Sequence, residues 1–522
     1  MDRNIILNID ITSVTGPFLN SILQKPAWQE EDLYPFVDQY IDLANGKESC
    51  LRTLVFNTFC QLSSVDSKYM TSFSTFVEKK LAAGAAFEEI SLYESPFYSI
   101  QKDFGIDPWD IWVRRCHQRG CEAWISIRMN DAHDRAYDEC MIDEYAYRAK
   151  WRDHAIGDRY GYYWKCLNYA HDEVRERMLG YIGEQLARYD MDGLELDFMR
   201  EIYCFDYLNQ PDCHLIMTQF MRDVRALVRE AEQTRGHAIT LSARLPCDLR
   251  HCLIWGFDVA AWTEEQLIDH VTPTPRWSSS DSDMPIAEWV SRFPGLRVSA
   301  GVETLLRFED LHRSEDDSTP HLDADTVNGL TAFYLSQGAE GINLYNYFCF
   351  PPSVSTASTH SNSLPLSYER TQDILARCSD AETVYSTQRR HIVMYQDIVP
   401  EGQERRKPLP CRVSGEAELT VSTGPICEDS SVWLFIAFAG DLPEAVQICT
   451  NGVPCDVLTQ TVQKELTEQP GSLCYRENSG IPDGSTLWCC EAPKCVWDAK
   501  KQHITVSADN ACITHLELRV LS

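Results

Sequence analysis

The residues most able to do chemistry in this sequence are two acids at alternate positions of a short apolar run. In the segment GLELDFMR, apolar side chains alternate with Glu195 and Asp197. A period of two is typical of a β-strand with one apolar face. Carboxyl groups on the other face are costly to bury unless they are paired or solvated. The pattern therefore indicates a site with Asp197 near the carboxyl end of the strand, and a structural acid pair bonded to arginine or backbone is the alternative.

Strand-like segments of this kind recur along the first 350 residues, with helical periodicity between them. The predicted strands span residues 4–10, 53–60, 122–131, 194–199, 238–245, 270–274, 297–303 and 341–347. The predicted helices span residues 38–44, 73–83, 108–119, 172–189, 214–232, 284–293, 324–337 and 368–378. Eight strands alternating with helices predict an α/β fold, the (β/α)8 or TIM barrel. An open doubly wound sheet is the alternative, but no GxGxxG follows the first strand.

The domain organisation changes near residue 389. Residues 1–388 are expected to form the barrel, with an aromatic-rich insertion at about 131–170. Residues 389–522 are expected to form an all-β sandwich. Its predicted strands span residues 418–422, 432–439, 445–450, 486–490, 503–507 and 513–520.

The composition narrows the classes of partner. The chain has 522 residues, 47 basic and 78 acidic, and a net charge of −31. This charge repels nucleic acid and anionic membrane surfaces, so neither is expected as a partner. No run of 18 apolar residues is present, so no transmembrane helix is predicted. A homo-oligomer is compatible with the composition.

The cysteines and the N-terminus bear on the compartment. Of 21 cysteines, nine fall between Cys411 and Cys512, and none forms a CxxC pair. Met1 leads directly into a strand-like alternation, without a cationic leader or a long apolar segment. These features favour a cytoplasmic protein with reduced thiols. A signal peptide removed from a precursor and a disulfide-bearing C-terminal domain are the alternatives.

Strand parity predicts which side chains face the lumen of the barrel. The inward sets are Asn8 and Asp10; Val55 and Asn57; Ser126, Arg128 and Asn130; Glu195 and Asp197; Ser242 and Arg244; Ser299, Gly301 and Glu303; and Asn343 and Tyr345. The outward sets are nearly all aliphatic. Active sites of such barrels lie at the carboxyl ends of the strands. Because the late inward positions are polar in seven strands, we expect the function to reside there.

A wider set of side chains is expected to bind substrate around these strand ends. The set comprises Asp10, Asn57, Arg128, Asn130, Asp131, His133, Trp164, Glu195, Arg200, Arg244, Arg276 and Tyr345. Glu195 lies one layer deeper and is expected to hold Arg128 or Arg244. The arginines either neutralise the acids or bind an acidic or sulfated sugar. The aromatic insertion is either a stacking platform for sugar rings or an internally packed subdomain.

The segment NDAHD, which contains Asp131 and His133, raises the hypothesis of a metal site. Aspartate and histidine in such proximity resemble a ligand cluster. No second histidine pair stands at helical or strand spacing elsewhere, so neither a metal nor another cofactor is expected. A metal-dependent hydrolase or lyase using Asp10, Asp131 and His133 is kept as an alternative.

One stretch resembles a known family. The run from Leu167 to Arg175 (LNYAHDEVR), followed by RYDMDGLELD at residues 188–197, is similar to the glycosyl-hydrolase-like TIM barrels, including the family 10-like branch. In those families a helix opens near N-P-x-V-R and leads into R-Y-D-V-D-G-I-x-x-D. Here no proline follows Asn168, and FMR follows Asp197 in place of a segment rich in tyrosine and proline. The resemblance spans about 35 residues and implies a glycoside hydrolase or a glycan-binding barrel that acts on a carbohydrate.

Glycosidic cleavage typically requires two carboxyl groups. Asp197 and Glu303 end the fourth and seventh strands, across the barrel mouth from each other. We predict Asp197 as nucleophile or base and Glu303 as general acid, with the roles open to exchange and Asp131 in reserve. A glycan-binding barrel without hydrolysis is the alternative function.

Overall fold

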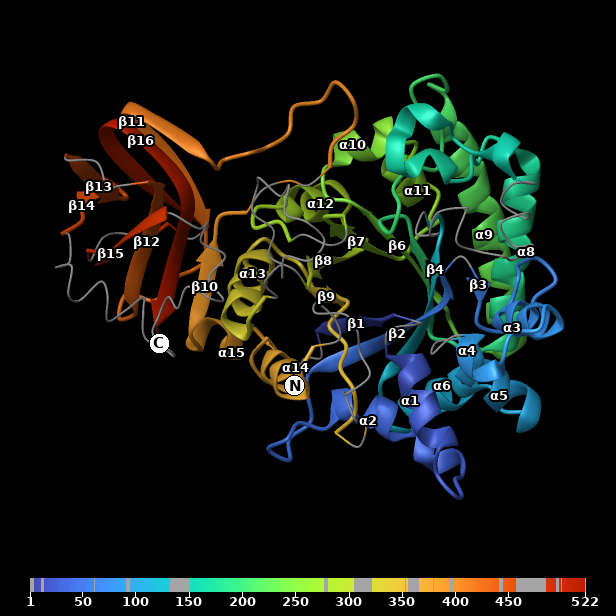
Figure 1. Ribbon diagram of the computed structural model, residues 1–522. Coiled ribbons are helices and arrows are strands. Elements are labelled where there is room, and N and C mark those ends of the chain that lie inside the picture. The colour runs from blue at the N-terminus through green and yellow to red at the C-terminus, as the bar shows by residue number, and fades with distance from the viewer. Residues whose placement is uncertain are drawn as a thin grey trace.

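The computed structural model describes residues 4–10, 14–60, 62–90, 94–131, 151–276, 280–304, 322–352, 354, 366–378, 380–394, 396, 398–440, 445–456, 485–493, 497–498 and 500–521. Eight parallel strands form a barrel (Figure 1): β1 (Ile5–Ile9), β2 (Leu51–Cys60), β4 (Glu122–Arg128), β5 (Gly193–Asp197), β6 (Thr240–Pro246), β7 (His270–Thr274), β8 (Arg297–Glu303) and β9 (Gly341–Tyr345). Each pairs with the next in chain order, and β1 pairs with both β9 and β2, which closes the sheet. The predicted TIM barrel is confirmed, and the open sheet is excluded.

Helices follow most of the strands and cover the outside of the barrel (Figure 1). The helices that the sequence predicts are α2 (Pro35–Ile41), α3 (Phe73–Ala82), α6 (Pro108–Gln118), α8 (Asp172–Arg188), α9 (Cys213–Arg235), α12 (Ile286–Arg292), α13 (Ala324–Ser336) and α14 (Tyr368–Arg377). The structure adds α1 (Thr15–Leu23), η1 (Glu30–Leu33), α4 (Phe87–Ile90), α5 (Glu94–Asp103), η2 (Arg152–His154), η3 (Asp158–Lys165), α10 (Leu249–Ile254), α11 (Val259–Glu264) and α15 (Ala381–Ser386). The added helices are mostly short, so their apolar period is too brief to identify them in sequence.

The packing follows strand parity. The outward aliphatic side chains, such as Leu194 and Leu196, belong to one large core shared with the helices. At the bottom of the lumen, Ile6, Val55 and Trp124 form a small apolar cluster of their own. Above this cluster the inward positions are polar, as predicted, and buried. Buried polar groups need hydrogen-bond partners, and the barrel mouth supplies these only in part.

Gly193 at the start of β5 makes room for the lumen cluster. A Cβ at this position would lie 2.6 Å from Nε1 of Trp124, whose side chain is fully buried. Trp124 in turn packs edge-on against His270, with ring centroids 5.3 Å apart. Both ring nitrogens of His270 bond to hydroxyls, Nδ1 to Ser242 at 2.8 Å and Nε2 to Ser299 at 3.0 Å. The floor of the lumen is therefore a packed layer with little freedom to shift.

The C-terminal part forms a seven-stranded sheet in which all described pairings are antiparallel. Its strands are β10 (Arg389–Ile392), β11 (Cys411–Ser422), β12 (Ser431–Ala439), β13 (Val446–Thr450), β14 (Val453–Pro454), β15 (Ser485–Glu491) and β16 (Lys501–Leu521). The two strands predicted at 503–507 and 513–520 are one continuous strand, β16. Its first half pairs with β11 and β13, and its second half pairs with β12 and β10. One strand thus serves two parts of the sheet, which the alternation of polar and apolar residues does not reveal.

The sheet lies against the barrel on the side of α13, and β10 is the strand of the sheet next to that helix (Figure 1). Glu517 of β16 is fully buried there and bonds to Arg390 at 2.7 Å, Arg519 at 2.7 Å and His515 at 2.9 Å. Arg390 also reaches Asp323, the N-cap of α13, at 3.3 Å. Burial works against the charged form of Glu517, but the two arginines outweigh it and hold the pKa of this carboxyl well below its ordinary value. This cluster links the barrel to the C-terminal sheet.

Cys489 and Cys490 of the C-terminal sheet are free thiols. Among the helices of the described part of the chain, none has the length and apolar character needed to cross a membrane.

We expect Gly193→Ala to lower the free energy of unfolding by about 1–3 kcal/mol, because Trp124 cannot move away from the added methyl group. The matched control is Gly183→Ala in α8, where a Cβ meets no atom within 4 Å. That change should raise the free energy of unfolding by about 0.5–1 kcal/mol, as alanine does in a helix. Urea denaturation of both variants makes the comparison. Equal stability of Gly193→Ala and the unchanged protein would contradict the packed floor.

Candidate active site

The centre of the barrel mouth is one guanidinium between two carboxyl groups. Arg244 on β6 places Nη1 3.0 Å from Oδ2 of Asp197 on β5 and Nη2 2.9 Å from Oε1 of Glu303 on β8. The Asp197 contact lacks hydrogen-bond alignment, whereas the Glu303 contact is a hydrogen bond. All three side chains are buried to within 1% of complete. Strands four, five and seven of the barrel thus bring together the two acids that the sequence selected.

Burial and charge set the protonation of this trio. Burial raises the pKa of Glu303 to about 8, and Arg244 only partly offsets this, while the nearby Asp197 raises it further. Burial disfavours the charged form of Arg244, but Asp197 and Glu303 outweigh it and keep its pKa above the ordinary value. The guanidinium also stacks on Tyr345 of β9, 3.7 Å from the ring centroid. Glu303 is therefore a carboxylic acid that still holds its proton at neutral pH.

Each acid has one oxygen fixed by the protein. Oδ1 of Asp197 accepts hydrogen bonds from the backbone N–H groups of Met199 at 2.9 Å and Arg200 at 3.1 Å, in the turn that follows β5. Oε1 of Glu303 accepts from Arg244. The second oxygens, Oδ2 of Asp197 and Oε2 of Glu303, are buried and have no hydrogen-bond partner among the described residues. Oδ1 of Asp197 and Oε1 of Glu303 orient the carboxyl groups, Oδ2 of Asp197 remains in the ion pair with Arg244, and Oε2 of Glu303 keeps its hydrogen-bonding capacity.

A second arginine, Arg128 on β4, lies between two further acids. It contacts Oδ2 of Asp10 at 2.6 Å and Oδ2 of Asp131 at 3.0 Å. Arg128 thus pairs with two other residues of the predicted binding set, Asp10 and Asp131. Arg128 carries one positive charge against two carboxylates, so the trio keeps a net negative charge. His133, which joins Asp10 and Asp131 in the metal hypothesis, lies outside the described residues.

The partners of Glu195 differ from those predicted. Its carboxylate accepts hydrogen bonds from the amide groups of Asn8 at 3.0 Å and Asn343 at 3.2 Å, and no ion pair joins it to Arg128 or Arg244 within the described chain. Burial raises its pKa to about 7, with Arg244 lowering it and Asp197 raising it. The expected grip on an arginine is corrected: Glu195 supports the site from the layer below, through two asparagines.

Asn130 and Asn57, both predicted to bind substrate, form hydrogen bonds with the backbone. Asn130 donates to the carbonyls of Leu167 at 3.0 Å and Tyr203 at 2.9 Å and accepts from the Leu167 N–H. Its amide is fully engaged, so it positions the end of the insertion, and this replaces its predicted contact with a ligand. Asn57 is different, because its oxygen accepts from the Phe59 N–H while its Nδ2 is buried without a partner in the described chain.

The aromatic insertion is partly an internal core. Tyr160 and Tyr163 pack against Tyr203, with ring centroids 5.2 and 4.7 Å away. Tyr162 is 51% exposed, and its partial burial raises the pKa of its hydroxyl, with Glu201 and Asp131 raising it further and Arg200 and Arg276 lowering it. Arg276 pairs with the buried Glu201 at 3.1 Å and lies 5.2 Å from the Tyr163 ring centroid. Tyr162 is thus the aromatic placed beside the charged mouth, while the platform role of the half-buried Trp164 stays a prediction.

Several further side chains near the site were not predicted from the sequence. On β7, Thr274 lies beside Gly301 and Thr272 lies near Asn343. The short segment HVTPT lacks a clear alternation of polar residues, so strand parity does not identify these side chains. Glu201 follows Arg200 in sequence and was overlooked because it lies beyond the strand. Asn346, just after β9, has φ of 65°, a strained setting that is frequent near functional sites.

Buried polar atoms without a hydrogen-bond partner are found at this end of the barrel. Within the described chain they include Nδ2 of Asn57, Oδ2 of Asp197, Nη1 of Arg244, Oγ1 of Thr274, Oε2 of Glu303, the hydroxyl of Tyr345 and Oδ1 of Asn346. Buried polar groups in folded proteins are nearly always bonded to protein, water or ligand. The concentration at the strand ends indicates that a polar ligand or water completes the site.

A cleft lies between loops of the barrel and the C-terminal part. It measures about 420 Å³ and is lined by Asp248, His251 and Arg406 together with Lys500 and Lys501 of the C-terminal part. A small neighbouring cavity shares Asp248 and His251 and reaches Thr274 and Arg276. Residues of both parts of the chain therefore line the larger of these two cavities.

Comparisons with known proteins were made against families, curated sequences and solved structures. No family model and no curated protein matches the chain. The similar solved structures include α-L-fucosidase isoenzyme 1 from Paenibacillus thiaminolyticus (12% identity, 97% of each chain, TM-score 0.35), an α-amylase from Lactobacillus plantarum (13% identity, 97% of this chain and 99% of the other, TM-score 0.36) and the catalytic domain of GH30 xylanase C from Talaromyces cellulolyticus (10% identity, 98% and 96%, TM-score 0.35). These neighbours are glycoside hydrolases by name. The likeness to these structures is weak, and the strand pairing itself establishes the barrel.

The raised pKa of Glu303 predicts a pH dependence of stability. The folded protein keeps a proton that the unfolded chain releases above about pH 4.5, so this contribution is complete below that pH and is lost as the pH rises to about 8. Urea midpoints should fall across this window, and Glu303→Gln should make the fall shallower, by up to about 1.4 kcal/mol per pH unit.

The control for this measurement is Glu265→Gln. A hydrogen bond from Arg222 lowers the pKa of Glu265, so both folded and unfolded chains have it ionised within the window. This variant should keep the slope of the unchanged protein. An equal slope in Glu303→Gln would show that Glu303 is ionised in the folded barrel.

Proposed function

We propose that this protein is a glycoside hydrolase in which Glu303 is the general acid and Asp197 is the nucleophile or general base. One observation carries the proposal: two buried carboxyl groups on β5 and β8 share one guanidinium, and each keeps one oxygen without a hydrogen-bond partner in the described chain. A protonated acid beside a second carboxyl group is the pair that glycosidic cleavage requires.

The chemistry follows from the two oxygens. Oε2 of Glu303 gives its proton to the glycosidic oxygen as the bond from that oxygen to the anomeric carbon breaks. Asp197 attacks the anomeric carbon, and water then displaces it, or Asp197 takes a proton from a water that attacks directly. In either route the sugar gains the water oxygen, and the leaving group departs as an alcohol. Arg244 holds both carboxyl groups in place.

The spacing of the acids is compatible with both routes. The ion pairs through Arg244 place Oδ2 of Asp197 and Oε1 of Glu303 within about 8 Å of each other, given the ~2.3 Å between guanidinium nitrogens. Retaining enzymes separate their carboxyl groups by about 5 Å and inverting enzymes by about 6.5–9.5 Å. The proposal therefore assigns the reaction and not its stereochemistry.

A carbohydrate fits the remaining features of the site. Sugar hydroxyls both donate and accept, which suits the mixed set of unpartnered groups that includes Asn57, Thr274 and Tyr345. Tyr162 offers a ring face beside the charged mouth. Arg128, Arg244 and Arg276 are each paired with protein acids, which favours a neutral sugar over an acidic or sulfated one. The sequence resemblance to glycosyl-hydrolase-like barrels agrees, and membership of the family 10-like branch stays a prediction.

A glycan-binding barrel without hydrolysis is the second candidate. The observation that favours it is that Arg244 pairs with both acids, which engages them in contacts within the protein. A glycan array combined with product analysis separates the two functions. Binding to a glycan that is recovered intact after a day would support the second candidate and contradict the first.

We expect Asp197→Asn to lower kcat/KM at least about a thousandfold, because a lost nucleophile or base removes transition-state stabilisation. Glu303→Gln should do the same on glycosides with poor leaving groups. It should lose much less on aryl glycosides whose phenol departs without a proton. Steady-state rates on both substrate types distinguish the roles of the two acids.

The control is Asp190→Asn, which lies before β5 at the opposite end of the barrel and pairs with His237 at 2.9 Å. Its activity should equal that of the unchanged protein. Full activity in Asp197→Asn, or a loss in Glu303→Gln that ignores the leaving group, would overturn the assigned roles.

A further inference from the structure

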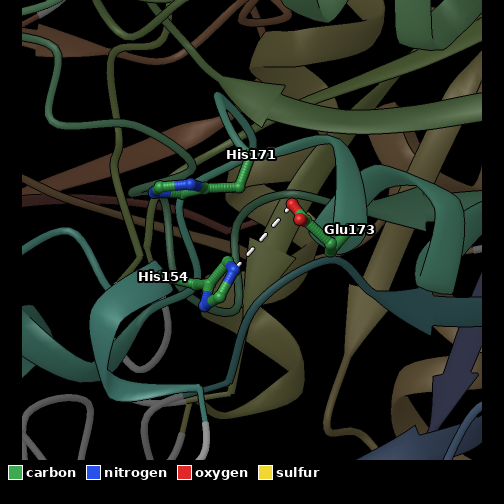
Figure 2. Close-up of side chains that lie close together, drawn as sticks. All are labelled: His154, His171 and Glu173. Carbon is green, nitrogen blue, oxygen red and sulfur yellow. Dashed lines mark ion pairs between the residues drawn. The ribbon is translucent and has the colours of Figure 1, made fainter.

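Two histidines and a glutamate lie together where the insertion meets α8. The nitrogens of His154 and His171 and a carboxylate oxygen of Glu173 offer one ligand atom each, and these atoms all lie within 4.8 Å of one another. Figure 2 shows that His154 comes from the insertion, while His171 and Glu173 come from the start of the helix opposite it. In sequence, 16 residues of varied composition separate the two histidines, and no short spacing motif identifies them.

The backbone around these residues is tied together. Ala155 and Leu167 form an antiparallel bridge, and the N–H of Asn168 donates to the carbonyl of His154 at 2.7 Å. The N–H of His171 donates to the carbonyl of Asn168 at 3.2 Å. His171 is then the N-cap of α8, which sets Glu173 in its first turn. The two histidines are thus brought together by main-chain bonds and do not depend on their own side chains to meet.

The side chains have the spacing of ligands and not of a closed ion pair. Nε2 of His154 is 3.8 Å from Oε2 of Glu173, beyond hydrogen-bond distance. The rings of His154 and His171 have centroids 4.7 Å apart at an angle of 61°, which is no stacked pair. In a tetrahedral zinc site with bonds of about 2.0–2.2 Å, ligand atoms are about 3.3 Å apart. The 64%-exposed side chain of Glu173 can close that difference by a change of rotamer.

The positive charges of α8 are engaged elsewhere. Arg175 bonds to the carbonyl of Tyr169 and to Asp172. Arg177 donates to the carbonyl of Tyr69 and lies 5.5 Å from the ring centroid of Trp151, which packs edge-on against His154 at 4.9 Å. Nδ1 of His154 is buried without a hydrogen-bond partner in the described chain. The arginines therefore border the cluster without occupying it.

We propose that His154, His171 and Glu173 bind a divalent transition metal ion of the zinc type, with water as the fourth ligand. Two imidazoles and one carboxylate form a ligand set that zinc favours, with one coordination position open. The ion joins the insertion to α8 and thereby supports Leu167, which Asn130 binds at the end of β4. This site is separate from Asp10, Asp131 and His133, and it departs from the expectation of a protein without metal. The inference does not depend on the proposed hydrolase activity.

The test uses the full chain without a purification tag, stripped with a chelator and titrated with Zn²⁺ by calorimetry at neutral pH. We expect one equivalent per chain, and at least a tenfold weaker Kd in each of His154→Ala, His171→Ala and Glu173→Gln. Because Glu173 is exposed, Glu173→Gln keeps the fold and remains informative if a histidine variant does not. Visible absorption of bound Co²⁺ reports four-coordinate geometry independently.

The matched control is His503→Ala. His503 pairs with Glu418 at 2.8 Å on the C-terminal sheet, as an exposed histidine–glutamate pair with no second histidine in its described surroundings. Its loss should leave the Zn²⁺ affinity unchanged. The urea midpoint of the unchanged protein should rise with Zn²⁺ and that of His171→Ala should not. Less than about 0.1 equivalent of zinc, or an affinity unchanged in the three ligand variants, would overturn the proposal and show a surface ion pair only.

Discussion

The pairing of Arg244 with both Asp197 and Glu303 is the interaction on which the barrel mouth depends. Three buried ionisable groups in a protein interior are stable only when their charges compensate one another. A positive charge between one carboxylate and one protonated carboxyl meets that condition and leaves a proton on Glu303. The same arrangement positions the acids on two strands that do not pair with each other. Structural compensation and chemical readiness therefore come from one contact.

The layers below the mouth make this pairing possible. Trp124, packed over Gly193, fills the floor of the lumen and excludes water. Above it, Asn8 and Asn343 hold Glu195 with neutral amide donors, which keeps a third acid from competing for Arg244. Because neutral donors stabilise the charge of Glu195 less than a cation does, burial prevails and its pKa rises to about 7. The polarity of the lumen thus increases in steps from floor to mouth.

The surroundings of the mouth follow the same principle of internal compensation. Arg128 satisfies Asp10 and Asp131, Arg276 satisfies Glu201, and Arg390 with Arg519 satisfies Glu517 at the contact with the C-terminal sheet. A chain with a net charge of −31 places several arginines where acids are buried. The unpartnered atoms of Asn57, Thr274 and Tyr345 stand out against this background. They mark the place where the protein leaves polar groups for something other than itself.

The sequence by itself determined the barrel, the parity of its strands and the identity of the two central acids. Periodicity is a local property, so alternation around Asp197 and at residues 297–303 was enough to set which side chains face inward. Partners are not local: Arg244 meets Glu303 across 59 positions, and Glu195 meets Asn8 across 187. Only the closed barrel decided that Glu195 binds amides, that Glu303 holds its proton and that β16 is one strand. The same holds for His154, His171 and Glu173, which main-chain bonds bring together, because side-chain type and spacing along the chain carry no record of such contacts.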